Sequence, residues 1–169
     1  WLYAITGPLL TAFATGDHYI SMSMLVKHGK ENMGIPRKTG SMVYPFYALF
    51  GRAGTALVTG ISYIAILKST VSLDIGVFQV LWVIVFSFLV SFSVSTVPGM
   101  SAFAAISLMW QVSGNPAGAA RDSYLILSAI APLLISIGVI MDVATSAFVS
   151  FLITHQDGLK VKIDARDFI

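Results

Sequence analysis

Residues 51–55 read Gly-Arg-Ala-Gly-Thr, and they interrupt an apolar stretch that otherwise runs from Ser41 to Leu67. The whole stretch is long enough to cross a bilayer, which takes about 20 mostly apolar residues. Two glycines around Arg52 weaken a helix at a depth where its backbone has no water to bind, so such a break survives only where protein or a wet cavity supplies partners. The sequence therefore predicts a broken transmembrane helix over residues 36–70.

The composition is also that of a membrane protein. Hydrophobic residues make up 56% of the 169 residues and charged residues only 11%, against roughly 25% charged residues in soluble domains. The 10 Lys and Arg and 8 Asp and Glu give a formal charge of +2, and they lie in short clusters, so the sequence predicts no nucleic-acid partner. The absence of Cys excludes disulfides, Cys-ligated metals and Cys nucleophiles.

The segment before the broken helix contains two apolar arms. Residues 1–15 and 19–26 are apolar, and Gly16, Asp17 and His18 separate them. Neither arm approaches the length of a membrane span. One continuous helix is the alternative, but it would place an aspartate and a histidine at membrane depth without a turn. We therefore predict a re-entrant hairpin over residues 1–35 with a polar tip.

A second hairpin is predicted over residues 75–113. No charged residue occurs between Ile75 and Ala120, and the stretch divides at residues 95–99, where Pro98 removes a hydrogen-bond donor and Gly99 permits a tight turn. The arm over residues 100–112 would be only about 20 Å long at about 1.5 Å per residue. It cannot reach the far side of a bilayer, so this hairpin is also predicted to be re-entrant.

The remaining elements complete a repeat. Residues 122–155 are predicted to form one long transmembrane helix that contains Pro132 and a lone acid, Asp142, and residues 156–169 form a polar tail. Hairpin and crossing element then occur twice, and the second copy is inverted because each unit crosses the membrane once. The predicted fold class is an all-α membrane protein with an inverted repeat of a re-entrant helical hairpin and a broken transmembrane helix.

The basic residues orient this topology. It places the loop over residues 27–38 and the tail on one side, and only Lys68 and Arg121 on the other. By the positive-inside rule, the loop and tail are cytoplasmic, as in a protein of the plasma (inner) membrane. The loop and tail bases are Lys27, Lys30, Arg37, Lys38, Lys160, Lys162 and Arg166. Because the sequence begins with Trp1 rather than Met and its first apolar stretch lacks a basic segment, we expect no signal peptide and a fragment of a longer protein.

Four ionisable side chains are predicted at membrane depth: Asp17, His18, Arg52 and Asp142. Each is costly there and is therefore a functional candidate, and the fold would bring all four toward one midplane centre. The planar guanidinium of Arg52 suits a carboxylate substrate. The structural alternative is an ion pair of Arg52 with Asp142 or Asp17. His18 is either a hydrogen-bonded tip residue or a proton carrier.

Hydroxyl side chains and catalytic motifs give weaker indications of function than the ionisable residues do. Five hydroxyl side chains could offer oxygens to an ion, or could simply pack between membrane helices: Thr55, Ser91, Ser93, Ser95 and Thr96. No phosphate loop, dinucleotide fingerprint or metal-ligand spacing occurs, so no enzyme, cofactor or metal is predicted. A membrane-embedded acid–base enzyme that uses Asp17, His18 and Asp142 is the open alternative.

Several of these stretches resemble one family. Residues 12–15, residues 31–35, Pro45 and residues 54–57 are similar to the first hairpin and following broken helix of the dicarboxylate/amino acid:cation symporters, the glutamate-transporter family. Residues 97–99, Val-Pro-Gly, resemble the tip of its second hairpin. The resemblance covers about residues 1–155 and corresponds to the last part of the family's transport domain, whose inverted-repeat plan is established for this class.

The resemblance implies a function and a set of site residues. It implies sodium-coupled uptake of acidic amino acids or C4-dicarboxylates through an elevator movement, in a homotrimer formed by a scaffold outside this chain. The coupling ion considered for this chain is Na⁺ or H⁺, because its ion-site residues depart from the family. The predicted substrate site combines the tips and break indicated by the resemblance with the ionisable side chains at membrane depth, and comprises Thr15, Gly16, Asp17, His18, Arg52, Thr55, Val97, Pro98, Gly99 and Asp142. The implied ion site comprises Gly51, Ser91, Asp142 and Ser146.

The sequence departs from the family at the ion site. The family's Asn-Met-Asp-Gly-Thr break reads Gly-Arg-Ala-Gly-Thr at residues 51–55, so the Asn and Asp associated with sodium are absent. A cation 4 Å from Arg52 would be repelled by about 4 kcal/mol at an effective dielectric near 20. The missing Asn and Asp and the added Arg52 argue against sodium coupling. They favour proton coupling through His18 or Asp142, or uncoupled exchange. The alternative is a transport-inactive homologue in which Arg52, Asp17 and Asp142 form a structural or regulatory charge network.

Overall fold

The computed structural model describes residues 2–71, 76–93, 101–112, 117–156 and 158. These residues form helices and contain no strand, as predicted for an all-α protein. The helices are α1 (Leu2–Thr15), α2 (His18–Met33), α3 (Arg37–Phe50), α4 (Ala53–Val71), α5 (Val77–Ser93), α6 (Ser101–Val112) and α7 (Ala117–Gln156).

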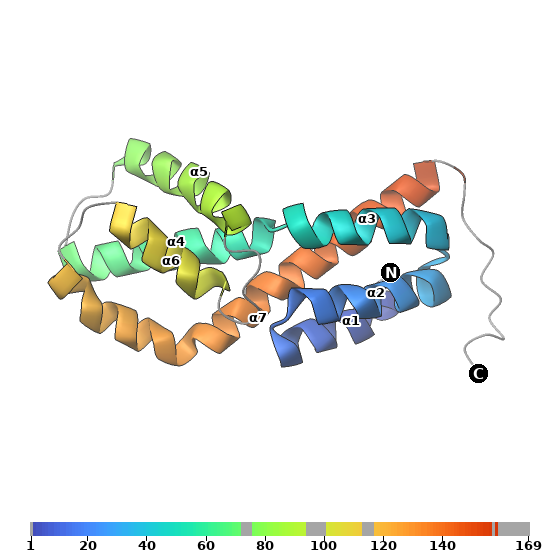
Figure 1. Ribbon diagram of the computed structural model, residues 1–169, viewed down its shortest axis with the longest axis horizontal. Helices are drawn as coiled ribbons and strands as arrows, with labels where there is room; N and C mark the ends of the chain where they lie inside the picture. Colours follow the sequence, from blue (N-terminus) through green and yellow to red (C-terminus); the bar gives the residue numbers. More distant parts are fainter. Residues whose placement is uncertain (1, 72–75, 94–100, 113–116, 157, 159–169) are drawn as a thin grey trace.

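The helices form two lobes along the long axis of the molecule (Figure 1). One lobe contains α1, α2, α3 and the second half of α7, and the other contains α4, α5, α6 and the first half of α7. Helices α3 and α4 lie almost in line across both lobes, and α7 crosses beneath them. Residues at the junction between α3 and α4 therefore lie at the centre of the molecule, against α7.

The break between α3 and α4 falls on Gly51 and Arg52. The Gly51 amide donates to the Tyr47 carbonyl at 2.8 Å and closes α3, and the Ala56 amide donates to the Arg52 carbonyl at 2.9 Å and opens α4. A Cβ atom at Gly51 would overlap the Tyr47 ring, so the chain needs a glycine at this point. The break thus places Arg52 where two collinear helices meet.

Helices α1 and α2 form an antiparallel hairpin. Gly16 turns the chain with a φ of 57°, in the left-handed region that glycine adopts without strain. Near the open end, Gly7 faces the His28 ring, and the Asn32 amide nitrogen donates to the Ala4 carbonyl at 3.3 Å. The turn lies against α7, since a Cβ atom at Gly16 would be 3.5 Å from the Ser136 hydroxyl.

Helices α5 and α6 pack on α4 in the other lobe. The start of α5 and the end of α6 lie at the far end of this lobe, whereas the end of α5 and the start of α6 lie toward the middle of the molecule (Figure 1). The predicted tip that contains Val97, Pro98 and Gly99 falls outside the described residues.

Helix α7 has 40 residues and begins at Ala117 rather than at residue 122. The sequence prediction started it after Arg121, where charge marks a membrane boundary, but a helix continues beyond a bilayer wherever its backbone bonds are satisfied. Forty residues correspond to about 60 Å, twice the thickness of the hydrocarbon core. The orange part of α7 in Figure 1 bends, and Pro132 inside the helix is a sufficient cause.

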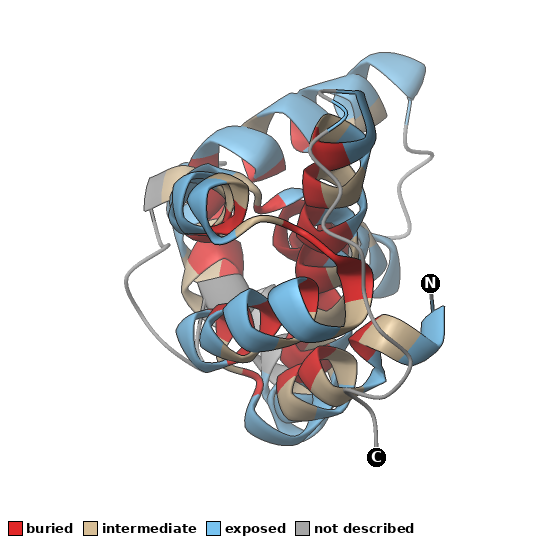
Figure 2. Cartoon of the chain, turned by 90° about the vertical axis from the view of Figure 1, so that its right-hand side faces the viewer, coloured by how far each residue is buried: buried red, intermediate tan, exposed pale blue. Residues whose placement is uncertain are grey.

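Buried residues lie on the inner faces of the helices (Figure 2), and many large apolar residues are exposed on the outside. The main core contains Ile5, Leu25, Tyr44 and Val143, and a second cluster forms around Tyr63 and Met109. Exposed apolar side chains include Tyr3, Met42, Phe46, Val77 and Phe78. Within the described ranges, two helical segments are long and apolar enough to cross a membrane, Arg37–Ser69 and Leu127–Gln156.

Candidate functional site

Asp142 on α7 closes the first turn of α4. Its carboxylate accepts hydrogen bonds from the Gly54 amide at 2.6 Å, the Thr55 amide at 3.3 Å and the Thr55 hydroxyl at 2.8 Å. The first backbone N–H groups of a helix have no intrahelical acceptor, and the helix dipole favours a negative charge at that end. Asp142 supplies both the acceptors and the charge from a fully buried position, with 0% of its surface exposed.

Two glycines let α7 approach α4 closely enough for this contact. A Cβ atom at Gly54 would collide with the Gly138 carbonyl and lie 2.6 Å from the Met141 Cβ atom. A Cβ atom at Gly138 would lie 3.3 Å from the Thr55 Cα atom. The close crossing of the two helices therefore depends on the absence of side chains at both positions, and it brings the short aspartate within reach of α4.

Arg52 lies beside this capped helix terminus. Only 3% of its surface is exposed. One guanidinium nitrogen, Nη2, donates to the Ala48 carbonyl at 3.4 Å, and the Tyr19 side chain also hydrogen-bonds the guanidinium. Both Asp142 and Asp17 lie within electrostatic range of it. The break thus holds a buried cation within electrostatic range of two aspartates from different parts of the fold.

Asp17 is engaged at the tip of the first hairpin. Its carboxylate accepts hydrogen bonds from the amides of Tyr19 at 2.8 Å and Ile20 at 3.1 Å, so it is the N-cap of α2. The Asp17 amide donates to the Thr15 hydroxyl oxygen at 3.2 Å. The first tip therefore uses its own acid to complete a helix end.

His18 is the exception among the ionisable groups. Its ring is 4% exposed, and neither ring nitrogen has a hydrogen-bond partner. The Tyr47 carbonyl lies near the ring without meeting hydrogen-bond geometry, and Arg52 lies within electrostatic range. The structure therefore does not show the hydrogen-bonded tip histidine that was one of the two predictions for this residue.

The other predicted ligands lie on separate elements. Ser91 on α5 is buried and its hydroxyl donates to the Phe88 carbonyl. Ser146 lies one turn after Asp142 on α7, and its hydroxyl donates to the Val143 carbonyl and contacts the Met22 sulfur at 3.3 Å. No group of three His, Asp or Glu side chains that could hold a metal occurs in the part of the chain that the structure describes.

Three site residues were not predicted from the sequence. The Gly54 amide binds Asp142, Gly138 permits the helix crossing, and Tyr19 hydrogen-bonds Arg52. Glycines inside apolar helices are a signal for close packing, and this signal could have indicated Gly54 and Gly138. Tyr19 directly follows the tip, and its hydroxyl in an otherwise apolar segment was the only available indication.

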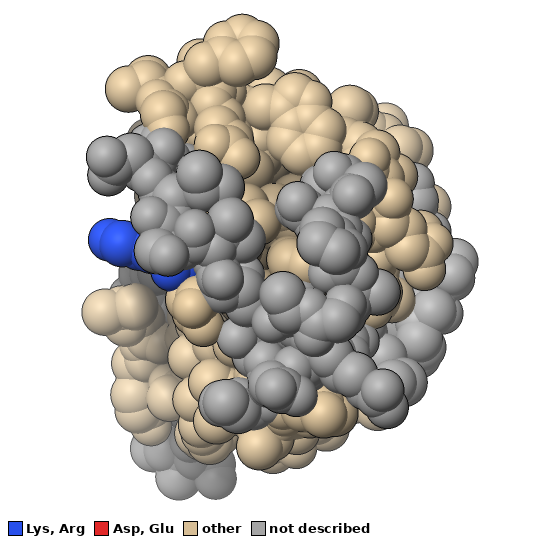
Figure 3. Space-filling view, turned by 90° about the vertical axis from the view of Figure 1, so that its left-hand side faces the viewer, with Lys and Arg blue, Asp and Glu red and all other residues tan. Residues whose placement is uncertain are grey.

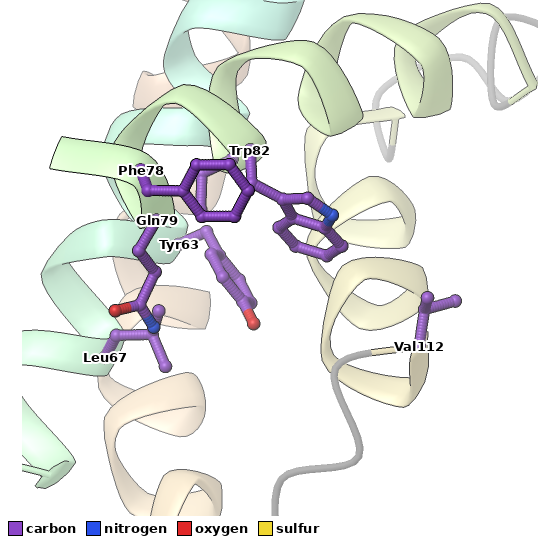
Figure 4. A pocket seen from close by; sticks show the side chains of 7 residues that line it. Tyr63, Leu67, Phe78, Gln79, Trp82 and Val112 are labelled. Atoms are coloured by element: carbon purple, nitrogen blue, oxygen red, sulfur yellow. The ribbon is translucent and has the colours of Figure 1, made fainter. Parts of the chain in front are cut away.

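A cavity of about 550 Å³ lies elsewhere, between α4, α5 and α6 (Figure 4). Its walls include Leu67, Phe78 and Trp82, and the Tyr63 hydroxyl and the Gln79 amide face the open space. Tyr63 follows Arg52 by about three turns of α4, or roughly 16 Å. The cavity contains none of the residues that the sequence indicated, so it is separate from the buried charges.

Comparison with known proteins identifies the family. A family model described as the sodium:dicarboxylate symporter family matches residues 1–156. No match was found among curated proteins or among solved structures. The match agrees with the resemblance seen in the hairpin and break residues, and members of this family are transporters rather than enzymes. Together with the two segments able to cross a membrane, it identifies an integral membrane protein of transporter type. The chain belongs to the sodium:dicarboxylate symporter family.

Proposed function

We propose that this protein is a secondary transporter, a symporter, of a small organic anion such as an acidic amino acid or a C4-dicarboxylate, and that Arg52 binds a carboxylate of this substrate. The observation that carries the proposal is the burial of the Arg52 guanidinium at the helix break. A buried charge is costly in a membrane and usually marks a functional site. A guanidinium can hold a carboxylate with two parallel hydrogen bonds, which gives both strength and orientation.

The placement of the helical hairpins supports a substrate site at the centre. The turn of the α1–α2 hairpin lies against the middle of α7, and the end of α5 and start of α6 point toward the same region from the opposite end (Figure 1). We propose that both hairpins are re-entrant halves of an inverted repeat. The tips, residues 15–18 and 97–99, then cover the substrate, with Thr55 and Asp142 beside it.

The distribution of basic residues supports an orientation. Lys27, Lys30, Arg37 and Lys38 are exposed where α2 ends and α3 begins, whereas Lys68 is exposed at the opposite end. Figure 3 views that opposite end, and its described surface is almost wholly uncharged. The proposal places the α2–α3 end and the tail at the cytoplasmic face of the plasma (inner) membrane. A homotrimer formed through scaffold helices outside this chain is part of the same proposal.

Proton coupling is proposed in preference to sodium coupling. The break carries Arg52, and the oxygens of Asp142 already accept three hydrogen bonds from α4. The other proposed sodium ligands are a backbone group at Gly51 and the hydroxyls of Ser91 and Ser146. Both hydroxyls donate hydrogen bonds to carbonyls of their own helices, and none of these three ligands carries a negative charge. His18 and Asp142 are the candidate proton carriers, because both are buried side chains that can bind or release a proton.

A second candidate is a transport-inactive homologue with a structural or regulatory role. Its support is that Asp142 and Asp17 are engaged with the N-termini of α4 and α2. These two acids therefore stabilise the fold without a substrate. In this case Arg52 would contribute positive charge to a permanent network.

Uptake by the purified protein in liposomes separates these candidates. Labelled glutamate, aspartate, malate and succinate would be offered while sodium and pH gradients are imposed separately. We expect uptake of at least one of these anions, driven by the pH gradient. A strict sodium requirement would overturn the coupling proposal while leaving the transporter. No uptake of any of the four under any gradient would favour the inactive homologue.

A further inference from the structure

An apolar groove of about 370 Å³ runs between α2 and α3, on the outside of the first lobe. Met22 and Val26 line it from α2, and Pro45, Ala48 and Leu49 line it from α3. Val26 and Leu49 are exposed, so the groove opens away from the core. On α2 it runs from Val26 to Tyr19, which corresponds to about 10 Å at 1.5 Å per residue.

Among the residues that the structure describes, exposed bases lie at one end of this groove only. Helices α2 and α3 are antiparallel neighbours, joined at residues 34–36, so the end of α2 and the start of α3 lie together. Lys30 follows Ser23, a groove residue, by seven positions, and Lys38 precedes Pro45 by seven. Residues seven apart share a helix face, so the faces that form the groove continue into Lys30 and Lys38.

The charge at this end is strongly positive. Lys27 and Arg37 are also exposed there, and Glu31 is the acid on the last turns of α2. The inner end of the groove, by contrast, is formed by Tyr19 and Leu49 and carries no charged side chain among its lining residues. The surface therefore consists of an apolar channel with a cationic mouth.

We propose that this groove binds an anionic phospholipid, with an acyl chain along the α2–α3 channel and the phosphate at Lys30 and Lys38. An apolar groove with basic residues at one end favours a ligand that has an apolar chain and a negatively charged head. An acyl chain matches an apolar channel that opens outward, and a phosphate is the charged end of a lipid that lies at the level of the helix ends. A zwitterionic lipid supplies the chain but no net charge for the basic mouth.

The first test is lipid binding by the purified, delipidated protein, measured by native mass spectrometry. Dioleoyl phosphatidylglycerol and dioleoyl phosphatidylcholine would be titrated separately, because they share acyl chains and differ in net charge. We expect tighter binding of phosphatidylglycerol. The double variant Lys30→Gln/Lys38→Gln should lose about 25-fold in affinity for phosphatidylglycerol, or about fivefold per base. Lys68→Gln removes a base at the opposite end and should leave the affinity unchanged.

A second variant tests the channel rather than its mouth. Ser23→Trp would place a large ring in the groove from an exposed position whose hydroxyl bonds only the Ile20 carbonyl of its own helix. We expect it to reduce the binding of both lipids with unchanged helix content by circular dichroism. The proposal is overturned if the wild type does not prefer phosphatidylglycerol, as when another protein segment covers the groove. It is also overturned if the double variant keeps the preference or Ser23→Trp binds both lipids normally.

Discussion

An aspartate caps the N-terminus of both α2 and α4, but one acid is a neighbour in the sequence and the other belongs to a distant helix. Asp17 directly precedes α2 and accepts hydrogen bonds from the amides of Tyr19 and Ile20. Asp142 comes from α7, 88 residues beyond Gly54 in the sequence, and is fully buried. The first acid stabilises one helix, whereas the second joins two helices at the centre of the molecule.

The difference has a physical consequence. When a partly exposed N-cap is removed, water can bind the freed amides, so the loss of stability is small. A buried N-terminus has no water to turn to, and each donor left without an acceptor bears its full desolvation penalty. The same hydrogen-bond pattern should therefore contribute much more to stability at α4 than at α2.

The largest effect is expected for Asp142→Ala. This change leaves the amides of Gly54 and Thr55 and the Thr55 hydroxyl without their acceptor in a buried site. We expect a loss of roughly 3–5 kcal/mol in the free energy of unfolding, measured by denaturant titration in detergent. Asp142→Asn keeps the shape of the side chain and one acceptor oxygen, so it should lose less stability than Asp142→Ala. Equal losses for both variants would show that the capping bonds do not hold α4 to α7.

An intermediate effect is expected for Gly54→Ala. The added methyl group would meet the Gly138 carbonyl, which is backbone and cannot rotate away. Overpacking of this kind typically costs about 1–3 kcal/mol, and the same titration would measure it. Ala53→Ser, at the exposed neighbouring position, is the matched control and should change stability by less than about 0.5 kcal/mol. A Gly54→Ala variant with an unchanged free energy of unfolding would argue that α4 and α7 do not cross this closely.

The smallest effect is expected for Asp17→Ala. Loss of an N-cap costs about 1 kcal/mol, because solvent can reach the freed amides. Asp17→Asn retains a capping oxygen and should remain within a few tenths of the wild type, again by denaturant titration. If Asp17→Ala destabilised the protein as much as Asp142→Ala, the contrast between a local and a long-range cap would be wrong.

The sequence was informative where the cause of a structure is local. The glycines around Arg52 indicate a break, and helix α3 ends at Phe50 while α4 begins at Ala53. Gly16, Asp17 and His18 between two apolar arms predict a turn, and Gly16 turns the chain there with a positive φ. Each of these features depends on residues within one or two turns of one another.

Contacts made across the fold were not predictable in the same way. Asp142 was a candidate because a lone acid in an apolar helix is costly, but its partners at Gly54 and Thr55 depend on how α7 crosses α4. The early start of α7 at Ala117 was missed because charges at residues 121 and 122 mark a membrane boundary rather than a helix end. Tyr19 was missed because its contact with Arg52 spans two elements.

The most direct test concerns Arg52 and uses anion uptake into liposomes by the variant Arg52→Gln. The carboxylates of Asp142 and Asp17 are already held by backbone amides, so removal of the guanidinium should leave both acids with partners and the protein folded. We expect normal thermal unfolding in detergent and no uptake of the anion that the wild type transports. Normal uptake by the folded variant would contradict the assignment of Arg52 as the carboxylate-binding residue.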